Sequence, residues 1–345
     1  MTTTKDIARR LNLSVSTVGR ALADDHRISA ETKLRVTQVA EELGYVANRA
    51  ARMMRGARSA VIGLVVPDVG NTFYSTVAHA LAETMGHHDH QVMLAESGDD
   101  RDAELRQIRH LAEAQVSGVV IVPTPKPHPE VHRLLRTIPH VQLLRKVPGL
   151  SPTWFGIDDR TVIHTATEHL LALGHRRIAY IGGTTDIPTA EARYAGYRDA
   201  HAEAGVPVVE ALTEFGSPAQ AVQGVDSVRR LLALRTPPTA VVTASVQITR
   251  GVLDAVHQDG VAVPERLSVV GFGDEVGFSW WGPGLTTISL PMREIATACG
   301  VWLLHQLAAN GAGGAQPAPY TSVSPGTLVE RGSTAPAPRR RAAKR

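Results

Sequence analysis

The chain has 345 residues, of which 43% are hydrophobic. This composition is ordinary for a globular protein, and the length suggests about two or three domains. No apolar run approaches the roughly 18 residues of a membrane-spanning helix, and the first residues, MTTTKDIARR, contain no apolar signal-peptide core. The single cysteine, Cys299, excludes an intramolecular disulfide framework. We therefore expect a cytoplasmic protein with no membrane partner.

Basic residues are concentrated at the two ends of the sequence. Residues 1–58 contain 11 Lys and Arg against 6 Asp and Glu, whereas residues 59–338 contain 20 against 27. Residues 339–345 add 5 basic residues. A basic head on an acidic body is typical of a DNA-binding module joined to a separate domain. For the basic tail, a role in solubility is a sufficient explanation.

The first 46 residues predict an all-α domain of three short helices. Apolar residues recur at helical spacing, and polar residues that can cap a helix precede each apolar segment. The predicted helices are Lys5–Leu11, Val15–Ala23 and Ala30–Leu43, with Thr4, Ser14 and Ser29 as their caps. Asn12, Leu13 and Ser14 form the tight turn between the first two helices.

From residue 60 onward, short β-branched strands alternate with amphipathic helices. The strands are expected at 61–66, 92–95, 118–122, 141–144, 178–181, 240–243 and 267–272. The helices are expected at about 73–86, 101–114, 160–173, 190–204, 219–234 and 247–259. This alternation indicates doubly wound parallel sheets in an α/β fold. Because the segment is too long for one sheet, we expect two lobes. The first comprises 59–158 and 287–317, the second 159–285 and 318–332, and 333–345 is a disordered basic tail.

Several motifs, in this order, resemble the LacI/GalR family of bacterial repressors between about residues 3 and 332. The resemblance is carried by KDIARRLNLSVSTVGRAL (5–22), NRAARMMRG (48–56), IGLVVPDVGNTFYSTV (62–77), EHLLALGHRRIAYIGG (168–183), RYAGYRDAH (193–201) and LSVVGFGD (267–274). It implies a helix-turn-helix domain at 1–46 and a hinge helix or linker at 47–58. A two-lobed periplasmic-binding-protein-like domain at 59–332 would bind the effector and form the dimer.

In this motif the second helix is the one that enters the major groove of DNA. Val15 can contact a thymine methyl group, Ser16 can hydrogen-bond to a base, and Arg20 can bind guanine. The residues suited to the phosphate backbone are Thr4, Ser14 and Thr17. Gly19 stands where the family commonly has serine, so no contact is carried over to it. The alternative is that Val15 and Arg20 are merely solvated helix residues.

Residues 48–56 resemble the family's hinge helix, which folds when two subunits meet on DNA. Met54 matches the apolar residue that enters a minor-groove step and kinks the duplex, where the family usually has leucine. The other DNA-binding candidates in this segment are Asn48, Arg49 and Ala51. Nine residues are too few for a stable isolated helix. The alternative is a flexible basic linker.

The resemblance places an effector site in the cleft between the lobes. Its candidate residues are Asn71, Phe73, Tyr74, Asp159, Arg193, Ser245, Asp274, Trp280 and Trp281. Alternatively, Asp159 caps the helix that follows it and Phe73 belongs to the core. Ser245-Val246 and Gly273-Asp274 replace polar pairs that are frequent in the family, so hydroxyl acceptors are fewer and stacking surface is greater. We therefore expect a sugar or sugar acid, with a purine-type corepressor as the alternative.

No catalytic, metal-binding or cofactor-binding constellation emerges from the sequence. The segment GFGDEVG (271–277) has its third glycine one residue late for a dinucleotide loop. His87, His88 and His90 have no cysteine or carboxylate at zinc spacing. A solute-binding protein would need a signal peptide and no helix-turn-helix, and an enzyme would need an acid–base or nucleophile set. We therefore expect a homodimeric, non-enzymatic repressor on a pseudo-palindromic double-stranded DNA operator.

Overall fold

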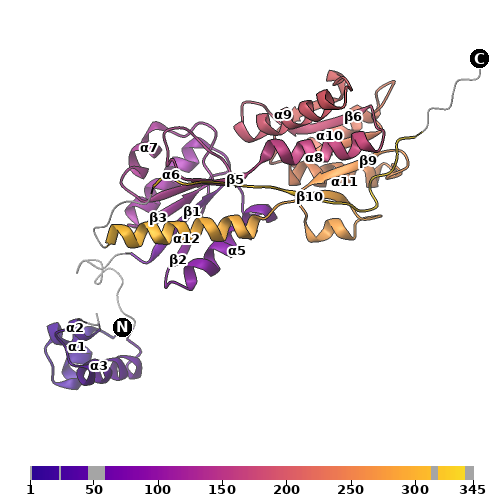
Figure 1. Cartoon of the computed structure of the whole chain (residues 1–345). Helices are drawn as coiled ribbons and strands as arrows, with labels where there is room; N and C mark the ends of the chain where they lie inside the picture. The colour runs from indigo at the N-terminus through magenta and orange to yellow at the C-terminus, as the bar shows by residue number, and fades with distance from the viewer. Residues whose placement is uncertain (1, 23–24, 46–58, 312–317, 339–345) are drawn as a thin grey trace, which may run out of the picture. The chain divides into compact units, whose positions relative to one another are not determined.

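The computed structural model describes residues 2–22, 25–45, 59–311 and 318–338. The chain forms two compact units, Met1–Ser59 and Ala60–Arg345, which are considered separately below (Figure 1). The predicted hinge residues Asn48, Arg49, Ala51 and Met54 lie outside the described residues, as does the basic segment 339–345. Within the described part of the chain, no helix is long and apolar enough to cross a membrane.

The described residues of the first unit form three helices: α1 (Thr4–Leu11), α2 (Val15–Ala21) and α3 (Ala30–Glu42). Their inward faces form a small core of Ile7, Ala8, Val18, Ala21, Val36 and Ala40. Asn12 adopts the left-handed conformation, with φ of 53°, and turns the chain from α1 into α2.

Two details of this unit differ from the sequence prediction. Thr4 is the first residue of α1 rather than its cap, and Thr3 occupies the cap position. The backbone N–H and the hydroxyl of Thr3 both donate to the carboxylate of Asp6, at 2.9 and 2.7 Å. The second helix ends at Ala21 instead of Ala23. Its boundary was set by apolar spacing, which does not locate a helix end closely.

The second unit contains two six-stranded sheets, each with helices on both faces (Figure 1). The strand order of the first sheet is β11-β5-β4-β3-β1-β2, and its paired neighbours are parallel. Its strands are β1 (Val61–Val66), β2 (Gln91–Glu96), β3 (Gly118–Ile121), β4 (His140–Leu143), β5 (Trp154–Ile157) and β11 (Thr321–Ser324). Its helices are α5 (Thr72–Gly86), α6 (Arg101–Glu113), α7 (Pro129–Leu135) and α12 (Met292–Gly311).

The second sheet has the order β12-β10-β9-β8-β6-β7, with only β12 antiparallel among its described pairs. Its strands are β6 (Ile178–Gly183), β7 (Thr213–Gly216), β8 (Ala240–Thr243), β9 (Ser268–Phe272), β10 (Thr286–Ser289) and β12 (Thr327–Val329). Its helices are α8 (Asp159–Ala172), α9 (Pro188–Glu203), α10 (Ala221–Leu232) and α11 (Val246–Gln258), with short 3-10 helices η1 (Glu210–Leu212) and η2 (Val276–Ser279).

One glycine shows how closely the helices of the second sheet pack. A Cβ atom on Gly196 of α9 would lie 2.0 Å from the carbonyl oxygen of Arg160 in α8. Any side chain there would force the two helices apart. This close approach places the amino-terminal parts of α8 and α9, which carry Asp159 and Arg193, beside each other.

The lobe boundaries predicted near the C-terminus are wrong in two places. β10 pairs with β9 in the second sheet, although residues from 287 onward were assigned to the first lobe. β11 pairs with β5 in the first sheet, although residues 318–332 were assigned wholly to the second lobe. Both strands have only four residues, and β11, TSVS, has no exclusively buried face. Such short polar segments carry too little apolar pattern to reveal their sheet.

Residues 333–338 are ordered, contrary to the predicted tail. Ser333 is fully buried, and its carbonyl accepts from the backbone N–H of Val269 at 2.9 Å. The backbone N–H of Ala337 donates to the carbonyl of Leu173, also at 2.9 Å. Composition alone suggested disorder because the contacts that order this segment come from distant parts of the chain.

Candidate functional site

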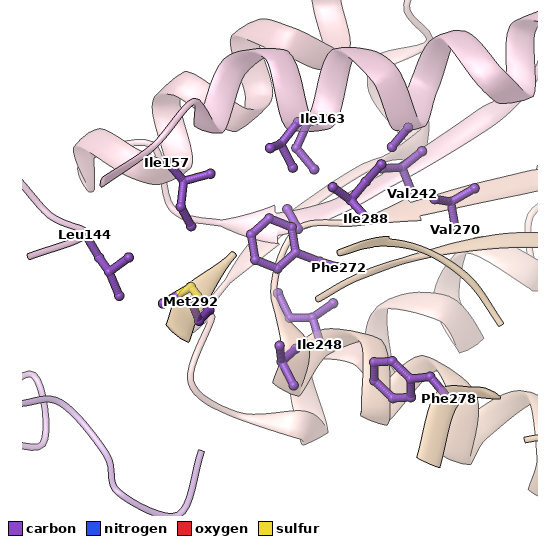
Figure 2. Close-up of a cluster of buried hydrophobic side chains, with 14 of the residues drawn as sticks. Leu144, Ile157, Ile163, Val242, Ile248, Val270, Phe272, Phe278, Ile288 and Met292 are labelled. Atoms are coloured by element: carbon purple, nitrogen blue, oxygen red, sulfur yellow. The ribbon is translucent and has the colours of Figure 1, made fainter. Parts of the chain in front are cut away.

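A cavity of about 90 Å³ lies between the two lobes, at the carboxyl ends of their parallel strands. This is where open α/β sheets commonly bind ligands. Six of the nine predicted effector residues line it: Asn71, Phe73, Tyr74, Asp159, Arg193 and Ser245. Four other lining residues that could contact a ligand were not predicted from the sequence, namely Asp68, Asp99, Arg145 and Phe272. Figure 2 shows Phe272 among buried side chains of both lobes, including Leu144 and Ile248.

Arg193 and Asp159 form a buried ion pair on the second lobe's side of the cavity. The Nε atom of Arg193 donates to Oδ1 of Asp159 at 2.6 Å, and Nη1 donates to the carbonyl of Ala244 at 2.8 Å. The guanidinium also lies 4.1 Å from the ring centroid of Phe272. This stacking fixes the plane of the guanidinium toward the cavity.

Asp159 is not the cap of α8. The preceding residue, Asp158, has that role, since its carboxylate accepts from the backbone N–H of Thr161 at 3.0 Å. Asp159 is therefore left to face the cavity. Burial raises the pKa of Asp159 above its ordinary value, and the neighbouring guanidinium of Arg193 acts in the opposite direction.

A second ion pair, Arg145–Asp99, faces the cavity from the first lobe. Nη1 and Nη2 of Arg145 donate to the two carboxylate oxygens of Asp99 at 2.6 and 3.1 Å, and Nη1 also donates to the carbonyl of Pro123 at 2.6 Å. Burial opposes the charge of Arg145, but the bonds to Asp99 outweigh it and raise the pKa of the guanidinium. Leu144, with φ of 61°, is a left-handed residue directly before Arg145.

Asn71 and Ser245 both line the cavity and cap helices there. The Asn71 side chain caps α5 by accepting from the backbone N–H of Phe73 at 3.1 Å. The Ser245 hydroxyl caps α11 at 3.2 Å and donates to the carbonyl of Pro218 at 2.8 Å. Both are helix caps whose hydrogen bonds fix the start of a helix at the cleft. Phe73, on the first turn of α5, is then held against the cavity.

The structure does not bring Asp274, Trp280 and Trp281 to this cavity, so their assignment to it is wrong. Asp274 accepts from Nη1 and Nη2 of Arg331 at 2.8 and 2.9 Å, and from the hydroxyl of Thr287 at 3.0 Å. Trp280 is 74% exposed. Asp274 and Trp281 line a separate cavity of about 710 Å³. Adjacent positions in a loop diverge once the loop turns, which the sequence does not reveal.

In the helical unit, α2 presents the residues predicted to read bases. Val15, Ser16 and Arg20 are exposed, whereas Val18 and Gly19 are buried. Gly19 therefore lies on the buried face of α2, and its departure from the family pattern leaves the exposed face unaltered. Ser14 caps α2 by accepting from the backbone N–H of Thr17 at 3.0 Å. Thr4 is partly buried at the start of α1.

Comparisons with known proteins agree with this architecture. Residues 3–48 match the model of bacterial regulatory proteins of the lacI family, and residues 167–334 match a periplasmic binding protein-like domain. The transcriptional regulator GalR of Salmonella typhimurium is 31% identical over 334 residues, 96% of each chain. The regulator DegA of Bacillus subtilis is 30% identical over 342 residues, 97% of this chain and 98% of the relative.

Solved structures also resemble nearly the whole chain. The transcriptional regulator CelR in complex with cellobiose has a TM-score of 0.71 and 26% identity, covering 96% of this chain and 100% of that one. The lac repressor dimer bound to operator and an anti-inducer has a TM-score of 0.82 and 24% identity, covering 97% and 99%; at this identity it speaks for the fold alone. The chain belongs to the LacI/GalR family. It is a DNA-binding transcriptional regulator and not an enzyme.

Proposed function

We propose that this protein is a cytoplasmic repressor, a homodimer on a pseudo-palindromic operator, that a sugar bound between the lobes releases from DNA. The observation that carries the proposal is the pair of Arg–Asp ion pairs facing one cavity from opposite lobes. A ligand that contacts both pairs stabilises the closed arrangement of the lobes. Ligand and operator then act on one two-state equilibrium.

The charges around the cavity favour a neutral sugar over a sugar acid. Two guanidinium groups, of Arg145 and Arg193, face three carboxylates, of Asp68, Asp99 and Asp159. Each guanidinium already has a carboxylate partner. An added ligand carboxylate would meet an excess of negative charge, whereas vicinal hydroxyls can donate to a carboxylate and accept from a guanidinium.

Phe73 and Phe272 supply apolar ring surface at the cavity. Their ring centroids are 6.4 Å apart, and both rings line the cavity. The apolar C–H face of a sugar ring packs well on such a surface. A sugar effector also agrees with the cellobiose bound to the relative CelR. A purine-type corepressor remains the alternative function.

On the DNA side, we assign base contacts to Val15, Ser16 and Arg20, and phosphate contacts to Thr4, Ser14 and Thr17. One helix-turn-helix reads a half-site, so a symmetric dimer fits a pseudo-palindrome. Met54, with Asn48, Arg49 and Ala51 beside it, is assigned to the hinge that kinks the minor groove.

The test is a gel-shift titration with the DNA upstream of the protein's own gene, with and without a panel of neutral sugars, sugar acids and purines. Arg20→Ala should lose roughly 1–3 kcal/mol of operator binding and relax the base preference at one position in each half-site. Arg106→Ala, an exposed arginine on α6 of the other unit, is the control and should bind normally. Equal binding by both variants would refute the base contact. Enhanced DNA binding with a purine would establish the corepressor alternative.

A further inference from the structure

One buried carboxylate of the first lobe, Glu104, has no part in the site described so far. Glu104 is 0% exposed and lies on the inward face of α6, one and two turns before the buried residues Ile108 and Leu111. Burial raises the pKa of this carboxyl above its ordinary value, because burial disfavours its charged form. An apolar side chain would suit this helix face better. A carboxylate is tolerated there only if strong hydrogen bonds offset the loss of water.

Both carboxylate oxygens of Glu104 accept from a single residue, Thr124. Oε2 accepts from the backbone N–H of Thr124 at 2.6 Å, and Oε1 accepts from its hydroxyl at 3.0 Å. Thr124 is itself buried and lies in the loop that follows β3. Hydrogen bonds to an ionised acceptor are the strong ones. The carboxylate therefore fixes the orientation of the peptide group whose N–H belongs to Thr124.

That same peptide group also holds Arg145. Its carbonyl belongs to Pro123 and accepts from Nη1 of Arg145 at 2.6 Å. In a trans peptide group the N–H and the C=O point in opposite directions. Glu104 therefore lies at the N–H end of the peptide group and Arg145 at its carbonyl end. The peptide dipole has its positive end at the carboxylate and its negative end at the guanidinium, so each charge stabilises the orientation that the other needs.

The start of α6 reaches Arg145 by a second route. Asp99 pairs with both Nη atoms of Arg145, and the next residue, Asp100, caps α6 by accepting from the backbone N–H of Ala103 at 2.6 Å. Among the described residues, the buried Nε atom of Arg145 has no hydrogen-bond partner. The placement of the guanidinium thus depends on the Nη bonds alone. Both sets of Nη bonds lead back to α6, one through Asp99 and the other through Glu104.

We infer that Glu104 is a positioning residue of the effector site, which sets the guanidinium of Arg145 at the cavity through the peptide group between Pro123 and Thr124. This inference rests on the proposed function, because it concerns a side chain that faces the effector. Glu104 is not among the described residues that line the cavity. It acts through Arg145, so its substitution should alter effector affinity only while Arg145 is present.

Isothermal titration of the full-length protein tests the inference on four forms: wild type, Glu104→Ala, Arg145→Ala and the double variant. The probes are D-glucose, D-galactose, D-ribose, cellobiose, lactose and hypoxanthine, and the probe that binds the wild type is used throughout. Glu104→Ala should weaken its binding by roughly threefold, less than the roughly tenfold expected for Arg145→Ala, because the guanidinium is displaced rather than removed. In the Arg145→Ala background, Glu104→Ala should leave the affinity unchanged.

Two further variants separate positioning from a general loss of folding. Glu104→Gln keeps an oxygen for the N–H of Thr124 and gains an amide that can donate to its hydroxyl, so it should restore most of the affinity. Asp102→Ala removes an exposed carboxylate from the first turn of α6 and should bind the probe as the wild type does. A purely structural Glu104 would lower the affinity by the same factor with and without Arg145, and that result would overturn the inference.

The proposed function and the inference fail under different results. If a sugar binds and the effects of Glu104→Ala and Arg145→Ala on its affinity are independent, the inference is wrong and the sugar effector stands. If none of the sugars binds the wild type, the proposed effector class is wrong, and chemical denaturation of the same four forms decides the inference. The two single losses of stability should then sum to more than the loss in the double variant, because both break one hydrogen-bond network. Additive losses would contradict it.

Discussion

The two ion pairs that face the effector cavity, Arg193–Asp159 and Arg145–Asp99, differ in how much of each guanidinium is already used. Arg145 makes a two-pronged pair and a third bond to Pro123. Arg193 contacts Asp159 through Nε alone and Ala244 through Nη1, so Nη2 takes no bond among the described residues. In Arg145 the Nε atom also lacks a hydrogen-bond partner in the described part of the chain, but it is buried. Arg193 thus keeps Nη2 as a donor for a ligand, whereas Arg145 principally holds the wall of the first lobe together.

If the two arginines differ in this way, the largest loss of effector affinity is expected from a substitution of Arg193. Arg193→Ala should weaken effector binding by about a hundredfold, since it removes the free donor and leaves a buried carboxylate unpaired. Operator binding without effector should stay near normal, as measured by gel shift across an effector titration. The control is Arg198→Ala, further along α9 at a half-exposed position. A variant that responds at the wild-type effector concentration would move the site elsewhere.

A substitution of Arg145 should reduce effector affinity less than one of Arg193, and should reduce the stability of the fold more clearly. Arg145→Ala should weaken the effector by roughly tenfold and lower the free energy of unfolding by about 2–4 kcal/mol, because the side chain is only 7% exposed. Arg145→Lys should not restore stability, since an ammonium cannot form the two-pronged bond. Chemical denaturation and effector titration on the same samples separate the two effects. Unchanged stability with an effector loss equal to that of Arg193→Ala would make Arg145 a primary ligand contact.

The sequence predicted Arg193 but missed Arg145, and the reason is physical. Arg193 lies in a recognisable motif, ARYAGY, on a long helix. Arg145 comes shortly after a four-residue strand and directly after Leu144, which adopts a left-handed conformation. Its partner, Asp99, lies in the loop after another strand, 46 residues earlier in the chain. Periodicity does not report on such a pairing, because it depends on strand order.

The same distinction holds for the fold. Seven strands (β1, β2, β3, β4, β6, β8 and β9) and the helices α5, α6, α8, α9, α10 and α11 were predicted to within a few residues, because their apolar patterns are strong. The helices α7 and α12 and the short strands β5, β7, β10, β11 and β12 were not predicted. The short strands form because they pair with strands far away in the sequence, which a local pattern does not show. In α12 the apolar residues are spread around the helix, so no amphipathic pattern distinguishes it. The exposed face of α2 agreed with its prediction because a three-helix unit is determined by local pattern.

The smallest expected effect is a pH dependence of stability, which tests how far Asp159 depends on its ion pair with Arg193. In the Arg193→Ala variant this carboxyl is buried without its cation, so its pKa should rise further above the value of about 3.9 in the unfolded chain. A carboxyl with a raised pKa in the folded state binds its proton more tightly there. Its contribution to stability is therefore complete below the unfolded pKa and is lost as pH rises through the folded one.

The difference in melting temperature between wild type and Arg193→Ala should accordingly widen as pH rises above the unfolded pKa of about 3.9, by roughly 2–4 °C for each kcal/mol. The double variant Arg193→Ala with Asp159→Asn lacks the titrating group, so its difference from the single variant reports Asp159 directly. At neutral pH the double variant should be the more stable of the two, because the amide needs no counter-ion. A difference that stays constant with pH would mean that Asp159 is solvated once Arg193 is removed, and that the ion pair, rather than burial, excludes water from this side of the cavity.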